Sequence, residues 1–266
     1  MISRSLATIQ MFWHGRPLSR IEQLSMVSFM RNGHAVELYV YEEPAGVPPG
    51  VRVRDAADIL PRSDVFMHKR RNSIGHFADW FRYELLWKRG GFWSDADIVC
   101  LAPFDYASPI VFAWQDEKFL NNAVLALPAG DALAKWMADS CRHPNRWLPY
   151  DDLKTRFHKV KRWVKGRGRE YVRWGNTGPY GLTSAARHLD YMKHALPRWH
   201  FYPVSYENHH VLFESGPLTF DRSRAVHIWN QIIEERGALD RNARFPADSP
   251  FEQLWARYMG SETLRH

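Results

Sequence analysis

The segment Gly90-Gly91-Phe92-Trp93-Ser94-Asp95-Ala96-Asp97 places two carboxylates one residue apart, at the edge of an apolar run that begins at Ile98. Alternate residues of an extended strand point to the same side, so Asp95 and Asp97 can converge on one hard cation that prefers oxygen ligands. Asp-x-Asp alone is a weak signal, because two solvated aspartates in a turn give the same pattern. Its position after a glycine-broken helix end favours a divalent metal site at the rim of a sheet.

Asp79 and Arg82 belong to the predicted helix upstream, where residues three apart are neighbours on the helix surface. An acidic acceptor beside a planar guanidinium suits sugar hydroxyls, which both donate and accept hydrogen bonds. An ordinary surface ion pair explains the two residues equally well when they are taken alone. Together with a metal that neutralises a leaving diphosphate, they indicate a pocket for a diphosphate-linked sugar.

Composition is that of a soluble α/β protein. The chain has 266 residues, of which 45% are hydrophobic and 24% charged, values typical of one large globular domain. Cys100 and Cys141 are too few for a disulfide framework, which favours reduced thiols in the cytoplasm. We expect no signal peptide, and no apolar run approaches the ~20 residues that span a bilayer.

Net charge is +7, and much of it lies in one segment. The basic residues there are Lys154, Arg156, Lys159, Lys161, Arg162, Lys165, Arg167, Arg169 and Arg173. Such a patch attracts anionic partners, and we expect an acidic glycan or an anionic membrane surface to bind residues 154–173, with the protein peripheral on the inner face of the membrane. A solvated helix face is the alternative. Nucleic acid is not expected, because no nucleic-acid-binding motif accompanies the charge.

The expected elements alternate between strand and helix. Residues 7–13 and 35–41 are predicted strands around a helix that Ser19 caps, with Glu22 completing a capping box, and this β-α-β order favours a parallel sheet. Further strands are expected at residues 51–53, 98–101, 110–114, 123–127 and 225–229, and helices at 75–89, 131–141 and 179–189. We expect a single domain, 1–266, with a basic helical insertion at about 144–174.

The region from Asp79 to Asp97 resembles the DXD sugar-binding region of glycosyltransferase family 32, because the aspartate, the arginine, the double glycine and the DXD fall in register. The resemblance covers about 75–103 well, and the segments around Trp13, Asn122, Gly178 and His227 more loosely. The clostridial glucosylating toxins are similar at a greater distance. The resemblance implies a GT-A fold, an α/β Rossmann-like architecture with a mostly parallel central sheet flanked by helices.

The same resemblance assigns roles to residues. Asp95 and Asp97 match the ligands of Mn²⁺ (or Mg²⁺), and His227 is the candidate third ligand. Asp79 and Arg82 match contacts to the donor sugar. The other donor-binding candidates are Phe12, Trp13, Trp93, Trp229 and Asp95 itself. For Trp13, which would stack on the base, packing in the core is the alternative.

The implied reaction is retaining transfer of a sugar from a UDP- or GDP-linked donor to a glycan, a lipid-linked saccharide or another acceptor, in bacterial surface polysaccharide synthesis. Front-face attack is expected, with the metal and Arg82 stabilising the departing diphosphate. Asn122 matches an acceptor-side strand, and Asp116 or Glu117 would orient the acceptor or steady positive charge on the ring. The chain departs from the family at Trp229-Asn230-Gln231, which replaces the usual Gly/His-Ser-Trp ending.

Two other functions remain open. Asp95-Ala96-Asp97-Ile98-Val99 is superficially similar to the nucleophile strand of haloacid dehalogenase-like phosphatases, although it lies deep in the chain rather than after a long first strand. A non-catalytic carbohydrate-binding relative is the second alternative. The intact set of Asp79, Arg82, Asp95 and Asp97 argues against it.

Overall fold

The computed structural model describes residues 6–230 and 240–260. The chain divides into two compact units. The first consists of Met1–Arg54, Ser94–Ala107 and Pro197–His266, and the second of Asp55–Trp93 and Ser108–Leu196. The expectation of a single domain with a basic insertion stays a prediction.

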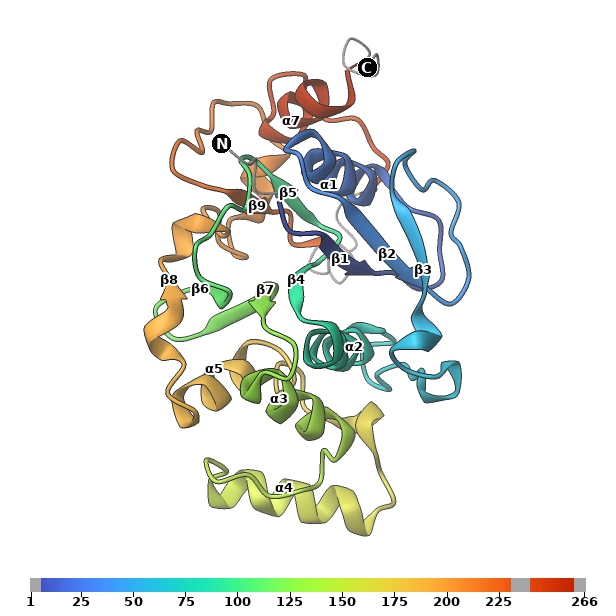
Figure 1. The fold of residues 1–266 in the computed structure, drawn as a ribbon, viewed down its shortest axis with the longest axis vertical. Coiled ribbons are helices and arrows are strands. Elements are labelled where there is room, and N and C mark those ends of the chain that lie inside the picture. The colour runs from blue at the N-terminus through green and yellow to red at the C-terminus, as the bar shows by residue number, and fades with distance from the viewer. Residues whose placement is uncertain (1–5, 231–239, 261–266) are drawn as a thin grey trace. The chain divides into compact units, whose positions relative to one another are not determined.

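The first unit begins with a β-α-β motif (Figure 1). Its strands are β1 (Ile9–Phe12), β2 (Val36–Val40), β3 (Arg52–Asp55, ending at the unit boundary), β5 (Ile98–Cys100) and β9 (Ala225–His227). Its helices are α1 (Arg20–Arg31) and α7 (Pro250–Met259), with 3-10 turns η5 (Arg198–His200) and η6 (His209–Leu212). Strands β3, β2 and β1 are neighbours in that order, and β1 runs parallel to β2 with Ile9 opposite Val36.

Helix α1 starts where the sequence predicts it. Ser19 accepts from the backbone of the first turn while the Glu22 carboxylate accepts from Ser19 N over 2.7 Å, which satisfies amides that have no partner within the helix. Ile21 and Leu24 on its apolar side join Val99, Val226 and Phe251 in a buried cluster. The helix thereby packs on β5 and α7, and the predicted parallel β-α-β arrangement is confirmed.

The second unit combines a sheet with a layer of helices. Its strands are β4 (Gly91–Ser94, whose last residue belongs to the first unit), β6 (Val111–Trp114), β7 (Leu120–Leu127) and β8 (Ala195–Leu196). Its helices are α2 (Gly75–Arg89), α3 (Ala132–Arg142), α4 (Leu153–Val164) and α5 (Pro179–His188). Its 3-10 turns are η1 (Ala56–Asp58), η2 (Arg62–Asp64), η3 (Arg169–Tyr171) and η4 (Met192–His194).

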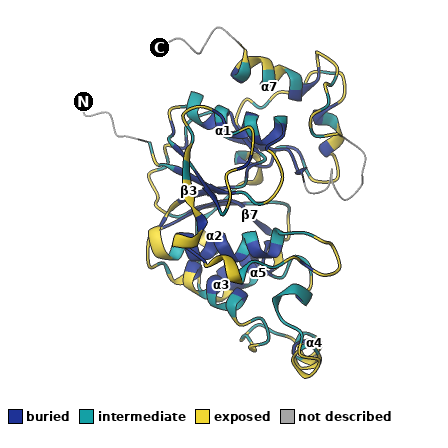
Figure 2. Ribbon diagram, turned by 90° about the vertical axis from the view of Figure 1, so that its right-hand side faces the viewer, coloured by how far each residue is buried: buried dark blue, intermediate teal, exposed yellow. Residues whose placement is uncertain are grey.

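Strand β7 is the centre of this unit. The order is β4-β7-β6-β8, with β6 antiparallel to β7 and parallel to β8. Every residue of β7 is buried, whereas α4 is largely exposed (Figure 2). Helices α2 and α5 pack on β7, and α3 packs on both helices. The α/β class with a mostly parallel sheet and flanking helices is therefore confirmed.

Glycine at position 90 ends α2. Gly90 has φ +65°, and a Cβ there would lie 2.4 Å from Ala129 N, so only glycine fits this turn. A glycine at the end of a helix normally predicts a left-handed cap. The ψ of Gly90 is −165°, which lies outside the left-handed helical region, so this cap differs from the predicted one. The glycine lets the chain turn sharply from α2 into β4, which leads to Asp95.

Several elements differ from the sequence prediction. Strand β7 begins at Leu120 rather than at 123, so Asn121 and Asn122 lie within it. Strands β4 and β8 and helix α7 are not anticipated by the sequence pattern. In the described part of the chain, the helices are too short or too polar to cross a bilayer.

Candidate functional site

The three predicted metal ligands lie together in the first unit. Asp97 immediately precedes β5, and the antiparallel pairing of β5 with β9 places Ile98 opposite His227. The amide of Ile228 donates to Asp97 O over 2.9 Å, which continues the ladder past Asp97. His227 Nε2 consequently lies 3.1 Å from Asp97 Oδ2.

One ligand atom from each of Asp95, Asp97 and His227 lies within 4.8 Å of the others. Two carboxylates and an imidazole form a donor set suited to Mn²⁺, and carboxylates also suit Mg²⁺. His227 Nδ1 is buried and has no hydrogen-bond partner among the residues that the structure describes. An imidazole with one nitrogen on a carboxylate and the other without a partner is typical of metal-binding histidines, so the residues fit a divalent ion.

Asp97 is held as a carboxylate. Burial raises the pKa of its carboxyl, but the electrostatic interaction with His227 and hydrogen bonds from His227 and the Asn230 amide lower it more, so the pKa lies below its ordinary value. The amide of Asn230 is 2.8 Å from Asp97 Oδ2. A metal therefore finds a deprotonated ligand there at neutral pH.

Asn230 is a site residue that the sequence prediction missed. Its side-chain Nδ2 donates to Glu22 Oε1 over 2.7 Å, so the residue connects Asp97 to the capped start of α1. Asn230 belongs to the Trp229-Asn230-Gln231 departure from the family pattern, which was the available signal. Gln231 lies outside the described residues.

Phe12 is the last residue of strand β1 and Trp13 directly follows it, whereas the predicted strand continued to Trp13. Phe12 is buried and meets Tyr41 edge to face at 6.1 Å. Trp13 is half-buried, its indole Nε1 donates to Arg16 O over 2.8 Å, and the Arg241 guanidinium lies 5.4 Å from its ring. Trp13 thus follows the carboxyl end of a parallel strand, and its stacking on the base stays a prediction.

Trp229 packs against the candidate metal ligand. Its ring lies 3.9 Å from the His227 ring, and its Nε1 donates to Val204 O over 3.0 Å. The residue has φ +60°, an uncommon conformation for a side chain of this size. Trp229 is 7% exposed and packs on the imidazole, and its predicted contact with the donor stays a prediction.

A second group of predicted residues lies together in the second unit, around the Asp79 carboxylate. Asn122 Nδ2 donates to Asp79 Oδ1 over 2.8 Å, and the hydroxyl of Thr177 donates to Asp79 Oδ2 over 2.7 Å. Asn122 also donates to the hydroxyl of Tyr83 over 3.2 Å. A Cβ at Gly178 would lie only 3.5 Å from Asp79 Oδ2, so this glycine leaves space beside the carboxylate.

Arg82 is buried, and its guanidinium contacts Asn122, Asp79 and Trp93. Nη1 donates to Asn122 O over 2.5 Å, Nη2 lies 3.4 Å from Asp79 Oδ1, and the guanidinium carbon lies 4.9 Å from the centre of the Trp93 ring. Trp93 is 2% exposed. Trp93 therefore stacks under Arg82 in this structure, and its predicted contact with the nucleotide stays a prediction.

Asp116 has a local structural role. Its Oδ1 accepts from the amides of Lys118 and Phe119 over 2.7 and 2.9 Å, which stabilises the turn between β6 and β7. Glu117, on the same turn, is exposed. The catalytic roles of Asp116 and Glu117 stay predictions.

Thr177 and Tyr83 were not among the predicted site residues. The Tyr83 hydroxyl donates to Thr177 O over 3.0 Å, which fixes the chain entering α5 to helix α2. Thr177 begins the Thr-Gly-Pro segment that the sequence resemblance had already singled out, and Tyr83 directly follows Arg82. Both residues could have been found from the sequence, because Thr177 is adjacent to Gly178 and Tyr83 is adjacent to Arg82.

Two protein families match the chain. Residues 51–118 match the glycosyltransferase sugar-binding region containing the DXD motif, and residues 170–245 match the α-1,4-glycosyltransferase conserved region. The first match includes Asp79, Arg82, Asp95 and Asp97, and the second includes Thr177 and His227. The resemblance to DXD-containing glycosyltransferases of the family 32 type is confirmed.

Curated relatives agree with these matches. Lactosylceramide 4-α-galactosyltransferase from Gorilla gorilla gorilla is 26% identical over 200 residues, covering 68% of this chain and 51% of the relative. Human α-1,4-N-acetylglucosaminyltransferase is 23% identical over 190 residues, covering 65% of this chain and 48% of the relative. The chain thus spans about half the length of the curated relatives it matches.

Among solved structures, the PaToxG glycosyltransferase is similar with a TM-score of 0.46 and 13% sequence identity, over 68% of each chain.

Proposed function

We propose that this chain, whose family matches describe DXD-containing glycosyltransferases, is a GT-A glycosyltransferase that moves a hexose from a UDP- or GDP-linked donor to a saccharide acceptor. One observation carries the proposal: Asp95 and Asp97, and His227, which is 130 positions from Asp97 in sequence, offer ligand atoms within 4.8 Å of one another. A divalent ion, Mn²⁺ or Mg²⁺, bound there would neutralise the diphosphate as it leaves the sugar.

The residues of the first unit would hold the nucleotide and the diphosphate. Trp13 offers a ring for the base at the end of β1, and stacking of this kind is worth ~1–3 kcal/mol per base. Glu22 and Asn230 keep Asp97 in place through the hydrogen bonds described above. Because these bonds fix the position of the carboxylate, it needs little rearrangement during the reaction.

Asp79 and Arg82 match contacts to the donor sugar in the resembling family. Asp79 accepts from Thr177 and Asn122, and its remaining acceptor capacity suits a sugar hydroxyl. Arg82 supplies positive charge that favours departure of the diphosphate. We propose front-face attack with retention, in which Glu117, exposed on its turn, orients the acceptor while Asp116 shapes that turn.

The relatives' names suggest the linkage and the acceptor. Both name an α-1,4 transfer, one of galactose to lactosylceramide and the other of N-acetylglucosamine. We propose that this chain adds a hexose in α-1,4 linkage to a glycan or lipid-linked saccharide. Since the sugar nucleotides of both hexoses are α-linked, such a transfer retains configuration. We further propose a role in bacterial surface polysaccharide synthesis at the cytoplasmic face of the membrane.

The two alternatives are less well supported. A haloacid dehalogenase-like phosphatase would carry the Asp-x-Asp motif after a long first strand, whereas Asp95 follows the short strand β4 deep in the chain. A non-catalytic carbohydrate binder does not need a metal site that stabilises a leaving diphosphate, so the cluster of Asp95, Asp97 and His227 argues against it. Both family matches also describe transferases.

Donor hydrolysis by the full chain tests the proposal. UDP-galactose, UDP-N-acetylglucosamine and GDP-mannose would each be incubated with Mn²⁺ or with excess chelator, with and without a lactose-terminated acceptor. We expect turnover of one donor that needs the metal and is lost in Asp97→Asn. The matched control is Asp105→Asn, an exposed aspartate of the same unit, which should keep full activity. Full turnover in chelator, or in Asp97→Asn, contradicts the proposal.

A further inference from the structure

Helix α4 presents its apolar side to solvent. Leu153, Phe157, Val160 and Val164 follow one another at spacings of four, three and four residues, which places them on one face. Their exposed fractions are 84%, 64%, 40% and 72%. A helix of a soluble protein normally buries such a stripe, so this orientation is the reverse of the usual one.

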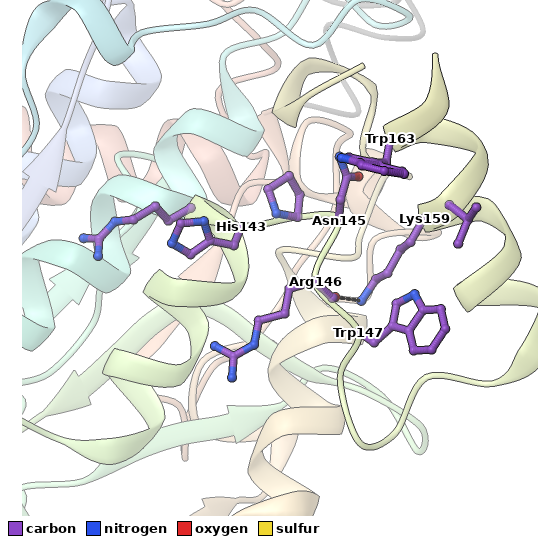
Figure 3. A pocket seen from close by; sticks show the side chains of 9 residues that line it. His143, Asn145, Arg146, Trp147, Lys159 and Trp163 are labelled. Carbon is purple, nitrogen blue, oxygen red and sulfur yellow. Dashed lines mark hydrogen bonds between the residues drawn. The ribbon is translucent and has the colours of Figure 1, made fainter. Parts of the chain in front are cut away.

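The side of α4 that carries Lys159 and Arg162 faces the protein. Lys159 is only 7% exposed, and its Nζ donates to Arg146 O over 2.8 Å and to Asp151 Oδ2 over 2.6 Å (Figure 3). Arg162 Nε donates to Asn145 Oδ1 over 2.5 Å. These bonds fix the rotation of the helix about its axis. The apolar stripe is therefore held outward by specific contacts on the opposite side.

Two tryptophans extend the apolar stripe. Trp163 is 70% exposed and Trp147 is 56% exposed. Both line a cavity of about 520 Å³ together with Val160 and Lys159 (Figure 3). Tryptophan is enriched where one end of a side chain meets lipid and the other meets water. We call Trp147, Leu153, Phe157, Val160, Trp163 and Val164 the α4 surface.

Positive charge borders the α4 surface. Lys154, Lys161 and Lys165 are exposed on the same helix or at its end. The segment 154–173 carries nine basic residues and one acidic residue, Glu170. An apolar stripe bordered by lysines is complementary to an anionic bilayer, because the stripe enters the acyl boundary while the lysines reach the headgroups.

We infer that the α4 surface docks on the surface of an anionic lipid bilayer, with α4 lying parallel to the membrane plane. Six of the ten large apolar side chains that are exposed in the described part of the chain belong to it. Contiguous exposed apolar surface of this kind marks an interaction site. The inference goes beyond sugar transfer, and its test needs no transferase activity.

Sedimentation with vesicles tests this docking. The full chain should bind phosphatidylcholine vesicles that contain phosphatidylglycerol, should bind pure phosphatidylcholine vesicles far more weakly, and should be released as salt rises from about 0.1 M to about 0.5 M. Phe157→Ser combined with Trp163→Ser should lower partitioning at least about ten-fold, because the apolar anchor is lost. The matched control is Tyr180→Ser combined with Trp199→Ser, two exposed aromatic residues outside the α4 surface.

A second pair of variants tests the charge. Lys154→Glu, Lys161→Glu and Lys165→Glu together should lower binding to anionic vesicles about 100-fold. Arg187→Glu, Lys193→Glu and Arg198→Glu make the same change in net charge at exposed sites elsewhere and should lower it much less. All substituted side chains are exposed, and thermal unfolding followed by circular dichroism verifies that each variant is folded.

Three outcomes overturn the inference. The first is a wild-type chain that does not sediment with anionic vesicles. The second is equal binding by the α4 variants and their controls. The third is a dimer in sedimentation velocity that dissociates on the Phe157→Ser, Trp163→Ser change without vesicle binding, because the α4 surface would then be an interface between two copies of the chain.

Discussion

The backbone amide of Asn230 donates to Asp97 Oδ2 over 2.8 Å, while the side chain of the same residue donates to the buried carboxylate of Glu22. Glu22 also accepts from Ser19 and from Arg241. One residue therefore connects a candidate metal ligand to the capping box that starts α1. Because the contact with Asp97 uses the main chain, the two connections can be changed separately.

Asn230→Asp should destabilise the protein strongly. The new carboxylate would lie beside Glu22, which is 0% exposed, and a buried charge without a partner costs ~3–5 kcal/mol. Asn230→Ala removes only the donor and should cost ~1–3 kcal/mol. Urea unfolding measures both free energies, with Asn242→Asp as an exposed control in the same unit. Equal stability of Asn230→Asp and Asn230→Ala would contradict the importance of the Glu22 contact.

His227→Asn should weaken binding of Mn²⁺ by at least about ten-fold, because the imidazole is one of three donors in the cluster. The same change removes an electrostatic interaction that lowers the pKa of Asp97. Protons should therefore compete with Mn²⁺ for the Asp97 carboxylate at a higher pH than in the wild type. Isothermal titration calorimetry with Mn²⁺ alone measures the affinity, and His210→Asn is the exposed control. An unchanged affinity in His227→Asn would remove this residue from the ligand set.

Much of the fold is predicted by local sequence patterns. The Ser19–Glu22 capping box and the glycine at the end of α2 each depend on residues close together in the chain, and each lies where it was predicted. Asp95 and Asp97 instead lie at a turn before β5, so the premise that they are alternate residues of an extended strand was wrong. His227 was found only through the family resemblance. Its approach to Asp97 depends on the pairing of β5 with β9, strands more than 100 residues apart.

Other features depend on packing that sequence periodicity does not encode. The contact between Glu22 and Asn230 joins residues 208 positions apart, so no local pattern reveals it. The apolar stripe of α4 predicts an amphipathic helix but not which side faces the protein, and the buried Lys159–Asp151 pair decides that. Trp93 lies in β4 with the Arg82 guanidinium over its ring, a contact between residues of different elements that periodicity does not reveal.

Asp79→Asn should lower kcat/KM for donor turnover about 100-fold, because the side chain loses its charge and one acceptor, so Thr177 and Asn122 can no longer both donate to it. Thr177→Val removes one of those donors and should cost about ten-fold, chiefly through the position of Asp79. Steady-state kinetics with the identified donor gives both values. Asp190→Asn, at an exposed aspartate of the second unit, should leave kcat/KM unchanged. If Asp79→Asn behaved like that control, Asp79 would have no part in donor binding.

His76 couples folding of the second unit to pH. It is 2% exposed, stacks on Trp174 at 4.8 Å, and lies 4.8 Å from the His68 ring, and neither of its ring nitrogens has a partner in the described residues. Burial lowers the pKa of His76 from 6.5 to about 4, although the charge of Asp79 raises it, while His68, Arg71 and Arg162 lower it further. The folded protein therefore holds His76 neutral in a range where the unfolded chain protonates it.

Stability should consequently fall as the pH falls below 6.5 and level off near the folded pKa of about 4, since the unfolded chain binds the additional proton in this range. The two pKa values correspond to a loss of roughly 3 kcal/mol at most. Urea unfolding of the wild type and His76→Gln at pH 7, 5.5 and 4.5 measures the effect, because glutamine stays neutral throughout. Subtracting the variant's pH dependence removes the contribution of all other groups. Parallel pH profiles for the two proteins would show that His76 titrates alike in both states and that its burial has no pH-linked cost.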